Sequence, residues 1–368
     1  MDKAPKSQDF SITLNFAAER PQNAAGRLLI VGWEGQDSGE IRDLIDEIRP
    51  GGLIFFRRNY PWPQDLGFFK RKAPKKGLSS RLVAPGRLRE ILFMVQKYAL
   101  KVLGRPLIIA VDQEGGTVKR LPKPFFQAQT AQAMGQLEDL DVWRIGFRLG
   151  QELKESGFNL NLAPVLDLDT GEGRYIRSRA FGSDPKVVAQ KAGAFMAGSL
   201  AAGVLNCGKH FPGLGGAFID PHERISEIDF SLDKMATPMD VFRALFAKGL
   251  RVVMTSHVLY PALDPSYVAT FSNEIVSVLR RDLGFDGLLL TDDLEMGGAT
   301  GSRDPGRAAV RAVLAGHDLC LVCRRIEAIR AARQALVTAI ANNQITKGHL
   351  LESGARLATI LARLPALT

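Results

Sequence analysis

The stretch GRPLIIAVDQE, residues 104–114, contains the pattern that decides the fold of this chain. A helical pattern ends at a glycine, a short apolar run follows the glycine, and acidic residues follow the run. Glycine just past a helix end supplies the left-handed residue that turns the chain back, so the pattern marks a junction between a helix and a strand. A continuous apolar run is typical of a parallel strand that helices cover.

The same pattern recurs along the chain. The further copies occupy residues 26–34, 51–58, 157–169, 203–211, 249–258, 284–293 and 316–323. Segments with apolar residues at helical spacing, such as 187–202 and 273–283, lie between the runs. Eight such units predict an α/β fold, a single (β/α)8 TIM barrel. A doubly wound open sheet is the alternative, but no GxGxxG follows the first run.

The length of the chain fits one barrel domain as well as two ordinary domains, and the sequence shows no linker between two domains. The chain has 368 residues, 46% of them hydrophobic. We expect an N-terminal extension at 1–25, a catalytic barrel at 26–368, and additional C-terminal helices at 325–368. Neither a signal-peptide run nor a bilayer-spanning apolar stretch is found in the sequence, which predicts a cytoplasmic protein without a membrane span. Three cysteines (Cys207, Cys320, Cys323) are too few for a disulfide framework and favour a reducing compartment.

The net charge of +9 raises the question of an anionic partner. Much of the excess lies in residues 57–89, where a basic insertion at 60–80 mixes Lys and Arg with Pro and Gly. We interpret this insertion as a solvated loop and expect no nucleic-acid partner. The oligomeric state is left open by the sequence.

Polar residues follow the apolar runs at their carboxyl ends. They are Asp112, Gln113 and Glu114 after the third run, Asp167 and Asp169 after the fourth, Lys209 and His210 after the fifth, Ser256 and His257 after the sixth, and Asp292 and Asp293 after the seventh. In a TIM barrel this rim carries the chemistry. His317 begins the eighth run and is expected to be structural. Carboxylates mixed with Lys, His and Arg favour a polyhydroxylated substrate. A metal is the competing interpretation, but Lys209 would repel a cation, so we expect neither metal nor other cofactor.

A second cluster of polar residues lies in CGKHFPGLGGAFIDPH, residues 207–222. Asp220 precedes His222 by two positions, a spacing that in an extended loop lets a carboxylate orient an imidazole. The cluster therefore predicts an acid/base pair. From these residues alone, a surface loop with an Asx turn before Pro221 is the preferred alternative.

Six segments in order resemble glycoside hydrolase family 3, and specifically its single-domain β-N-acetylglucosaminidases of the bacterial NagZ type. They are VDQEGGTVKRL (111–121), NLNLAPVLDLD (159–169), RAFGSDP (179–185), KHFPG (209–213), VVMTSHVLYPALD (252–264) and LLLTDDLEM (288–296). The resemblance covers most of the predicted barrel.

The resemblance implies a role for each matching residue. Asp292 corresponds to the nucleophile, and His222 to the acid/base group that Asp220 orients. Sugar-binding positions correspond to Asp112, Arg120, Arg179, Lys209 and His210. For His257 we expect a supporting role behind these residues. We expect Glu114 to support the glycine turn at 115–116, and Asp293 to cap the next helix.

The implied function is an exo-acting, retaining β-N-acetylhexosaminidase that removes terminal N-acetylglucosamine during peptidoglycan recycling. The alternatives are a β-glucosidase or β-xylosidase, a noncatalytic muropeptide-binding barrel, and a barrel lyase with Lys209 as Schiff base. Hydrolysis and phosphorolysis both remain open. The chain departs from the family pattern in three places: PGLGG (212–216) replaces PGHGD, DPH (220–222) replaces DSH, and Thr117 replaces an arginine in DQEGGRV. These departures bear on the substrate.

Overall fold

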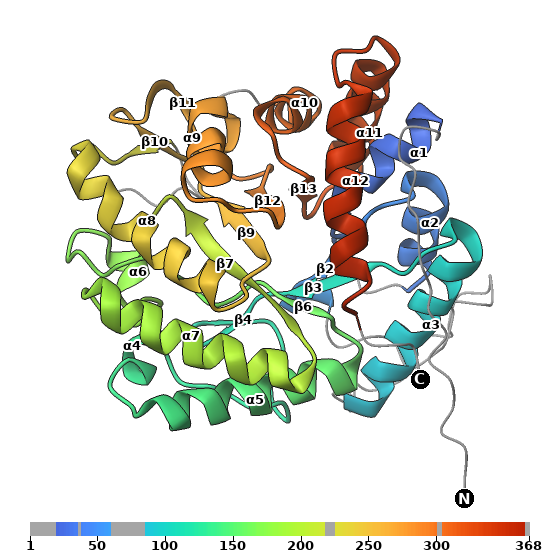
Figure 1. Cartoon of the computed structure of the whole chain (residues 1–368). Coiled ribbons are helices and arrows are strands. Elements are labelled where there is room, and N and C mark those ends of the chain that lie inside the picture. Colours follow the sequence, from blue (N-terminus) through green and yellow to red (C-terminus); the bar gives the residue numbers. More distant parts are fainter. Residues whose placement is uncertain (1–19, 36–37, 60–84, 218–224, 300–303, 365–368) are drawn as a thin grey trace, which may run out of the picture.

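A closed barrel of parallel strands forms the centre of the molecule in the computed structural model (Figure 1), which describes residues 20–35, 38–59, 85–217, 225–299 and 304–364. The barrel strands are β1 (Leu29–Val31), β2 (Gly52–Phe55), β3 (Ile108–Val111), β6 (Leu160–Asn161), β7 (Leu205–Phe211), β9 (Val252–Thr255), β12 (Leu288–Asp293) and β13 (Leu319–Val322). They pair in chain order, and β1 closes the barrel by pairing with β13. The predicted (β/α)8 barrel is confirmed.

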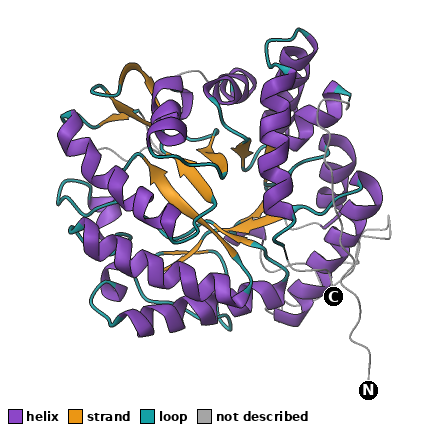
Figure 2. Cartoon of the chain, in the orientation of Figure 1, coloured by secondary structure: helices purple, strands orange, loops and turns teal. Residues whose placement is uncertain are grey.

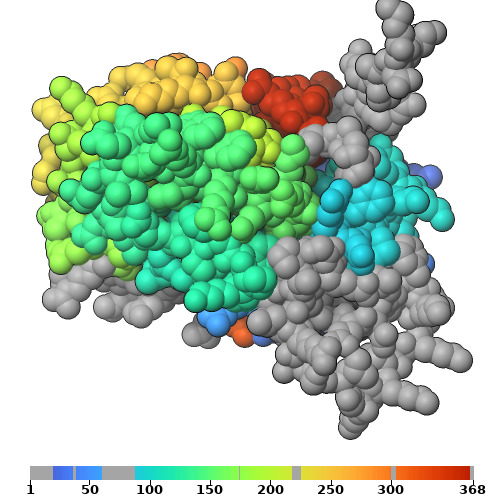
Figure 3. Space-filling model, turned by 90° about the horizontal axis from the view of Figure 1, so that it is seen from below, coloured from blue at the N-terminus to red at the C-terminus, as the bar shows by residue number. Residues whose placement is uncertain are grey.

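Helices form the outer layer around the strands (Figure 2). They are α1 (Pro21–Arg27), α2 (Ser38–Ile48), α3 (Pro85–Leu103), α4 (Ala131–Met134), α5 (Asp139–Ser156), α6 (Arg174–Arg177), α7 (Pro185–Ala202), α8 (Leu232–Ala247), α9 (Asn273–Ser277), α10 (Pro305–Ala315), α11 (Ile326–Ala341) and α12 (Lys347–Leu361). A π-helical turn at Val278–Asp282 continues α9. The predicted helices at 187–202 and 273–283 and the C-terminal helices are therefore present. From below, the segments from α3 to α7 form one continuous surface (Figure 3).

Most of the predicted helix-to-strand junctions use a left-handed glycine. Positive φ angles occur at Gly104, Gly157, Gly203, Gly249, Gly284 and Gly316. The first two junctions differ from the prediction. Gly26 lies inside α1, where a Cβ would come within 1.9 Å of the Ile48 carbonyl oxygen. At the second junction Arg49, with φ of 58°, takes the left-handed conformation in place of Gly51.

Two small sheets follow barrel strands at their carboxyl ends. One pairs β4 (Gln113–Gly115) with β5 (Val118–Lys119) directly after β3. The other contains β8 (Ser226–Glu227), β10 (Val258–Tyr260) and β11 (Asp264–Val268), with β10 in the middle. Both sheets therefore lie at the end of the barrel where the sequence predicts the site.

The remaining sequence predictions concern surface and boundaries. The predicted boundary between the N-terminal extension and the barrel, at residue 26, falls inside α1, and α1 packs against α11. This boundary stays a prediction. The basic insertion at 60–80 lies outside the described residues. All three cysteines are buried thiols. In the part of the chain that the structure describes, no helix is both long enough and apolar enough to cross a membrane.

Candidate active site

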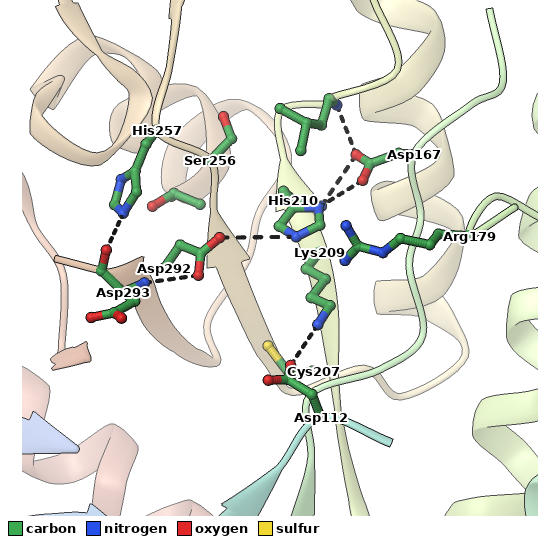
Figure 4. A network of polar contacts seen from close by, with 12 residues as sticks. Asp112, Asp167, Arg179, Cys207, Lys209, His210, Ser256, His257, Asp292 and Asp293 are labelled. Atoms are coloured by element: carbon green, nitrogen blue, oxygen red, sulfur yellow. Dashed lines mark hydrogen bonds and ion pairs between the residues drawn. The ribbon is translucent and has the colours of Figure 1, made fainter. Parts of the chain in front are cut away.

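Polar side chains from different strands meet at the carboxyl end of the barrel (Figure 4). β7 supplies two of them, Lys209 and His210, which come just before its last residue, Phe211. All seven residues of β7 are buried. β12 supplies Asp292 at its end, and Asp112 follows β3. The predicted sugar-binding residues and the predicted nucleophile therefore lie within one region. Asp220 and His222 lie outside the described residues.

A buried ion cluster occupies one side of this region. The Lys209 ammonium lies 2.8 Å from Asp112 Oδ1 and 2.7 Å from Glu114 Oε1. Arg179 donates to both carboxylate oxygens of Glu114, at 2.9 and 2.8 Å. Arg120 Nη2 donates to Asp112 Oδ2 at 3.2 Å. Glu114 is therefore the common partner of Lys209 and Arg179, and the prediction that it serves the glycine turn is wrong. Its carboxylate needs both cations, because it is almost fully buried.

The charges in this cluster are permanent near neutral pH. Burial raises the pKa of Glu114, but Arg179 and Lys209 outweigh it and hold the pKa at about 2. The pKa of Asp112 is lowered in the same way, against burial, by Lys209 and Arg120. Burial lowers the pKa of Lys209, yet its two carboxylate partners leave that pKa above its ordinary value. A Schiff base requires a neutral amine, so this environment argues against the lyase alternative.

His210 is held by Asp167, a residue to which the sequence assigned no role. His210 Nδ1 lies 2.7 Å from Asp167 Oδ2, and the other carboxylate oxygen accepts from the backbone N–H groups of His210 and Leu214. Asp167 is fully buried. The arrangement leaves His210 Nε2 facing Asp292, 4.0 Å from its Oδ2. The position of Asp167 at the end of the fourth apolar run is the sequence feature that could have identified it as a site residue.

Asp292 is an ionised carboxylate at the mouth of the barrel. Its side chain is 21% exposed, and its Oδ1 accepts from the Asp293 N–H at 2.8 Å. Burial raises the pKa of Asp292, but the imidazoles of His210 and His257 and the Asp293 N–H outweigh it, so the pKa is lowered. An accessible, ionised carboxylate beside donors for sugar hydroxyls has the properties of a glycosidase nucleophile.

Asp293 differs from its neighbour. Burial raises its pKa to about 7, and its Oδ1 accepts from the N–H groups of Glu295 and Cys323. It therefore caps a turn, because the described residues directly after β12 form turns rather than the predicted helix. The Asp293 carbonyl lies 3.0 Å from His257 Nε2.

Two of the departures from the family pattern, Leu214 and Gly216, are packed tightly. Leu214 is buried, and a Cβ on Gly216 would come within 2.5 Å of the Phe230 ring. An aromatic side chain therefore occupies the space beside the position where the family usually has an acid. No sequence pattern pointed to Phe56. Its ring lies under the Arg120 guanidinium, and the centre of the ring is 5.3 Å from Arg120 Cζ. Among the described residues, no cluster of His, Cys, Asp and Glu has the composition of a metal site.

Comparisons with known proteins agree on one family. Residues 26–360 match the family described as "Glycosyl hydrolase family 3 N terminal domain". The chain is 34% identical to a protein named "Beta-hexosaminidase" from Neisseria gonorrhoeae, over 81% of this chain and 78% of that protein. It is 32% identical to a protein of the same name from Pseudomonas aeruginosa, over 86% of each chain.

Solved structures show the same likeness. A glycoside hydrolase family 3 β-N-acetylglucosaminidase from Paenibacillus sp. superposes with a TM-score of 0.84 at 31% identity over 94% of this chain. This chain spans 63% of the length of that enzyme. A β-N-acetylhexosaminidase from Beutenbergia cavernae superposes with a TM-score of 0.80 at 28% identity, covering 94% of this chain and 99% of that one.

Proposed function

The chain belongs to glycoside hydrolase family 3 and is a glycosidase of that family, and we propose that it is an exo-acting, retaining β-N-acetylhexosaminidase. The proposed substrates are peptidoglycan-derived saccharides with N-acetylglucosamine at the non-reducing end. The observation that carries the proposal is the ionised carboxylate of Asp292 facing a fixed set of sugar-hydroxyl partners. The names of the hexosaminidase relatives support the acetamido sugar.

The proposed reaction is a double displacement. Asp292 attacks the anomeric carbon, the bond to the leaving oxygen breaks, and that oxygen takes a proton from His222, which acts as the acid. His222 then removes a proton from water, the water oxygen attacks the same carbon, and the bond to Asp292 breaks. Two inversions return the starting configuration. The roles of His222 and of Asp220, its orienting partner, rest on the family resemblance.

The ion cluster is proposed to hold the terminal sugar. An ammonium has three donors, and two of those on Lys209 are directed to Asp112 and Glu114, which leaves one for a hydroxyl. Arg120 Nε is buried without a hydrogen-bond partner among the described residues. Asp112, Arg120, Arg179, Lys209 and His210 together provide donors and acceptors at fixed angles, as a polyhydroxylated ligand requires.

Release of 4-nitrophenol from the aryl N-acetyl-β-glucosaminide tests the proposal. Wild type is expected to cleave it, with the β-anomer formed first when the reaction is followed by NMR. Asp292→Asn is expected to lose at least about 10³-fold in kcat, because an amide cannot form the glycosyl ester. Asp318→Asn is the matched control, since it removes another buried aspartate carboxylate, one that lies beside Arg280 at the start of β13. It is expected to keep its kcat.

Azide sharpens the test of the nucleophile. In Asp292→Ala, azide at high concentration is expected to enter the vacated space and convert a dinitrophenyl substrate to the α-glycosyl azide. His222→Ala is expected to lose least on that substrate, whose leaving group needs little protonation. A wild type that cleaves the aryl glucoside as fast as its acetamido analogue supports the β-glucosidase alternative. Sugar binding with no cleavage of any aryl glycoside supports the noncatalytic alternative, which the Leu214 and Gly216 departures favour.

A further inference from the structure

We propose that His257 is a positioning residue that acts through the backbone of Asp293 to set the orientation of Asp292. This inference rests on the proposed nucleophilic role of Asp292. His257 follows β9, and only 1% of its surface is exposed. Its Nε2 lies 3.0 Å from the Asp293 carbonyl oxygen, and its Nδ1 lies 2.7 Å from Thr270 Oγ1. Neither contact involves the site where the sugar is proposed to bind.

Residue 293 is the link between the imidazole and the nucleophile. Its N–H donates to Asp292 Oδ1 at 2.8 Å, so the conformation of residue 293 determines which oxygen of Asp292 is occupied. Its carboxylate accepts from the N–H of Cys323 at 3.2 Å, and its carbonyl faces His257. The same carbonyl also accepts from the N–H of Met296 at 3.0 Å, so without His257 it loses one of two hydrogen-bond partners, the buried one that fixes its direction. The peptide unit between residues 293 and 294 keeps its backbone hydrogen bonds from Met296 and to Leu321, but it is held less firmly, so the dihedral angles of residue 293 shift and Asp292 moves with its N–H partner.

The hydrogen bond from His257 Nε2 to the Asp293 carbonyl forms whether the imidazole is neutral or charged. A carbonyl only accepts, so His257 Nε2 carries a proton whenever the contact to Asp293 is made. Thr270 has one hydroxyl proton, and both the Ser256 carbonyl, at 2.9 Å, and His257 Nδ1 lie within reach of it. If the Thr270 hydroxyl donates to Nδ1, Nδ1 carries no proton and the imidazole is neutral. If the hydroxyl donates to the Ser256 carbonyl, Nδ1 carries a proton of its own and donates to Thr270 Oγ1. The Nε2–H donation to Asp293 is present in both states.

Buried groups behind His257 keep the ring in place. Thr270 lies 3.2 Å from Thr255, which lies 2.9 Å from His317 Nε2. Burial lowers the pKa of His317 to about 3, so it is neutral, and its Nδ1–H donates to the Ala312 carbonyl in α10. The two threonines and His317 are fully buried. A continuous series of close polar contacts therefore runs from α10 to the carboxyl end of β12, and the expectation that His317 is structural is confirmed.

Three substitutions of His257 test the inference. Glutamine places an amide N–H where Nε2 is now, whereas asparagine is too short to reach the Asp293 carbonyl. His257→Ala and His257→Asn are expected to lower kcat about 100-fold, the cost of displacing a reacting group by about 1 Å. His257→Gln is expected to recover most of that loss. KM is expected to change less than about threefold, because the sugar partners lie on other strands.

Two measurements separate positioning from general damage. The fraction of competent enzyme is counted by covalent labelling with the 5-fluoro glycosyl fluoride of N-acetylglucosamine and intact mass, so that kcat is stated per active site. His349→Gln, which changes a half-buried histidine in α12, is the control and is expected to keep wild-type kcat. Thr270→Val is expected to lower kcat as well, and its effect is expected to be smaller in the His257→Ala background than in wild type.

Two results would overturn the inference. One is an unchanged kcat per active site in His257→Ala with only the labelled fraction reduced, and the other is a His257→Gln enzyme as slow as His257→Ala. If wild type is active and azide rescues Asp292→Ala, either result removes the role of His257 while the proposed function stands. A wild type that cleaves no aryl glycoside overturns both.

Discussion

Replacing Glu114 with glutamine tests the buried ion cluster. Glu114 accepts hydrogen bonds from Arg179 at 2.9 and 2.8 Å and lies 2.7 Å from the Lys209 ammonium. Glutamine keeps the shape of the side chain but removes the charge, which leaves two buried cations with one carboxylate fewer. The change therefore isolates the electrostatic part of the interaction.

The magnitude follows from the pKa of Glu114. The folded-state pKa of about 2 lies below the ordinary value of 4.5, and this difference corresponds to about 3 kcal/mol. Breaking a buried ion pair costs about 3–5 kcal/mol. With an unfolding entropy of about 2.1 cal/mol/K per residue over 368 residues, Tm is expected to fall by about 4–6 °C. The stabilisation is fully present above the ordinary pKa and is lost as the pH falls from there towards 2.

Activity is expected to fall together with stability. Lys209 and Arg179 lose the carboxylate that orients them, so kcat/KM on the aryl N-acetyl-β-glucosaminide is expected to drop about 100-fold. Glu47→Gln is the matched control, because Glu47 pairs with Arg330 at 2.7 and 2.8 Å while both side chains are substantially exposed. It is expected to cost less than about 1 kcal/mol and to leave kcat/KM unchanged. A Glu114→Gln enzyme with the Tm and kcat/KM of Glu47→Gln would refute the reasoning.

Three further predictions concern stability. The pKa of Asp293 in the folded state, about 7, lies above its ordinary value of 3.8, so stability falls as the pH rises from 3.8 to about 7. The free energy of unfolding of wild type is therefore larger at about pH 5 than at about pH 8. Asp293→Asn is expected to reduce that difference by about 3 kcal/mol, measured by urea denaturation. Asp318→Asn, between two arginines, is expected to cost about 3–5 kcal/mol in the same assay, and a cost near zero would contradict this. Gly216→Asp is expected to cost about 1–3 kcal/mol because its Cβ meets the Phe230 ring, and Phe230→Ala in the same chain is expected to recover part of the loss of Tm.

Local signals in the sequence were enough for the order of the strands and for the position of the site. Each apolar run between glycines became a barrel strand, because burial and backbone conformation depend on residues that are close in the chain. The same signals put Asp112, Lys209 and Asp292 at strand ends, and a parallel barrel brings all such ends to one rim. The roles of Asp220 and His222 stay predictions.

Local signals did not predict which of the rim residues pair. Glu114 and Arg179 are 65 positions apart, and Asp112 and Lys209 are 97 positions apart. Asp167 was placed at the rim from its position in a run, but its contact with His210 depends on how β6 and β7 lie side by side. The sequence by itself therefore determined the barrel and the chemical types of residue at its rim. Only the closed tertiary structure decided the partners, because a buried charge pairs with whichever opposite charge the folded chain brings within hydrogen-bond distance.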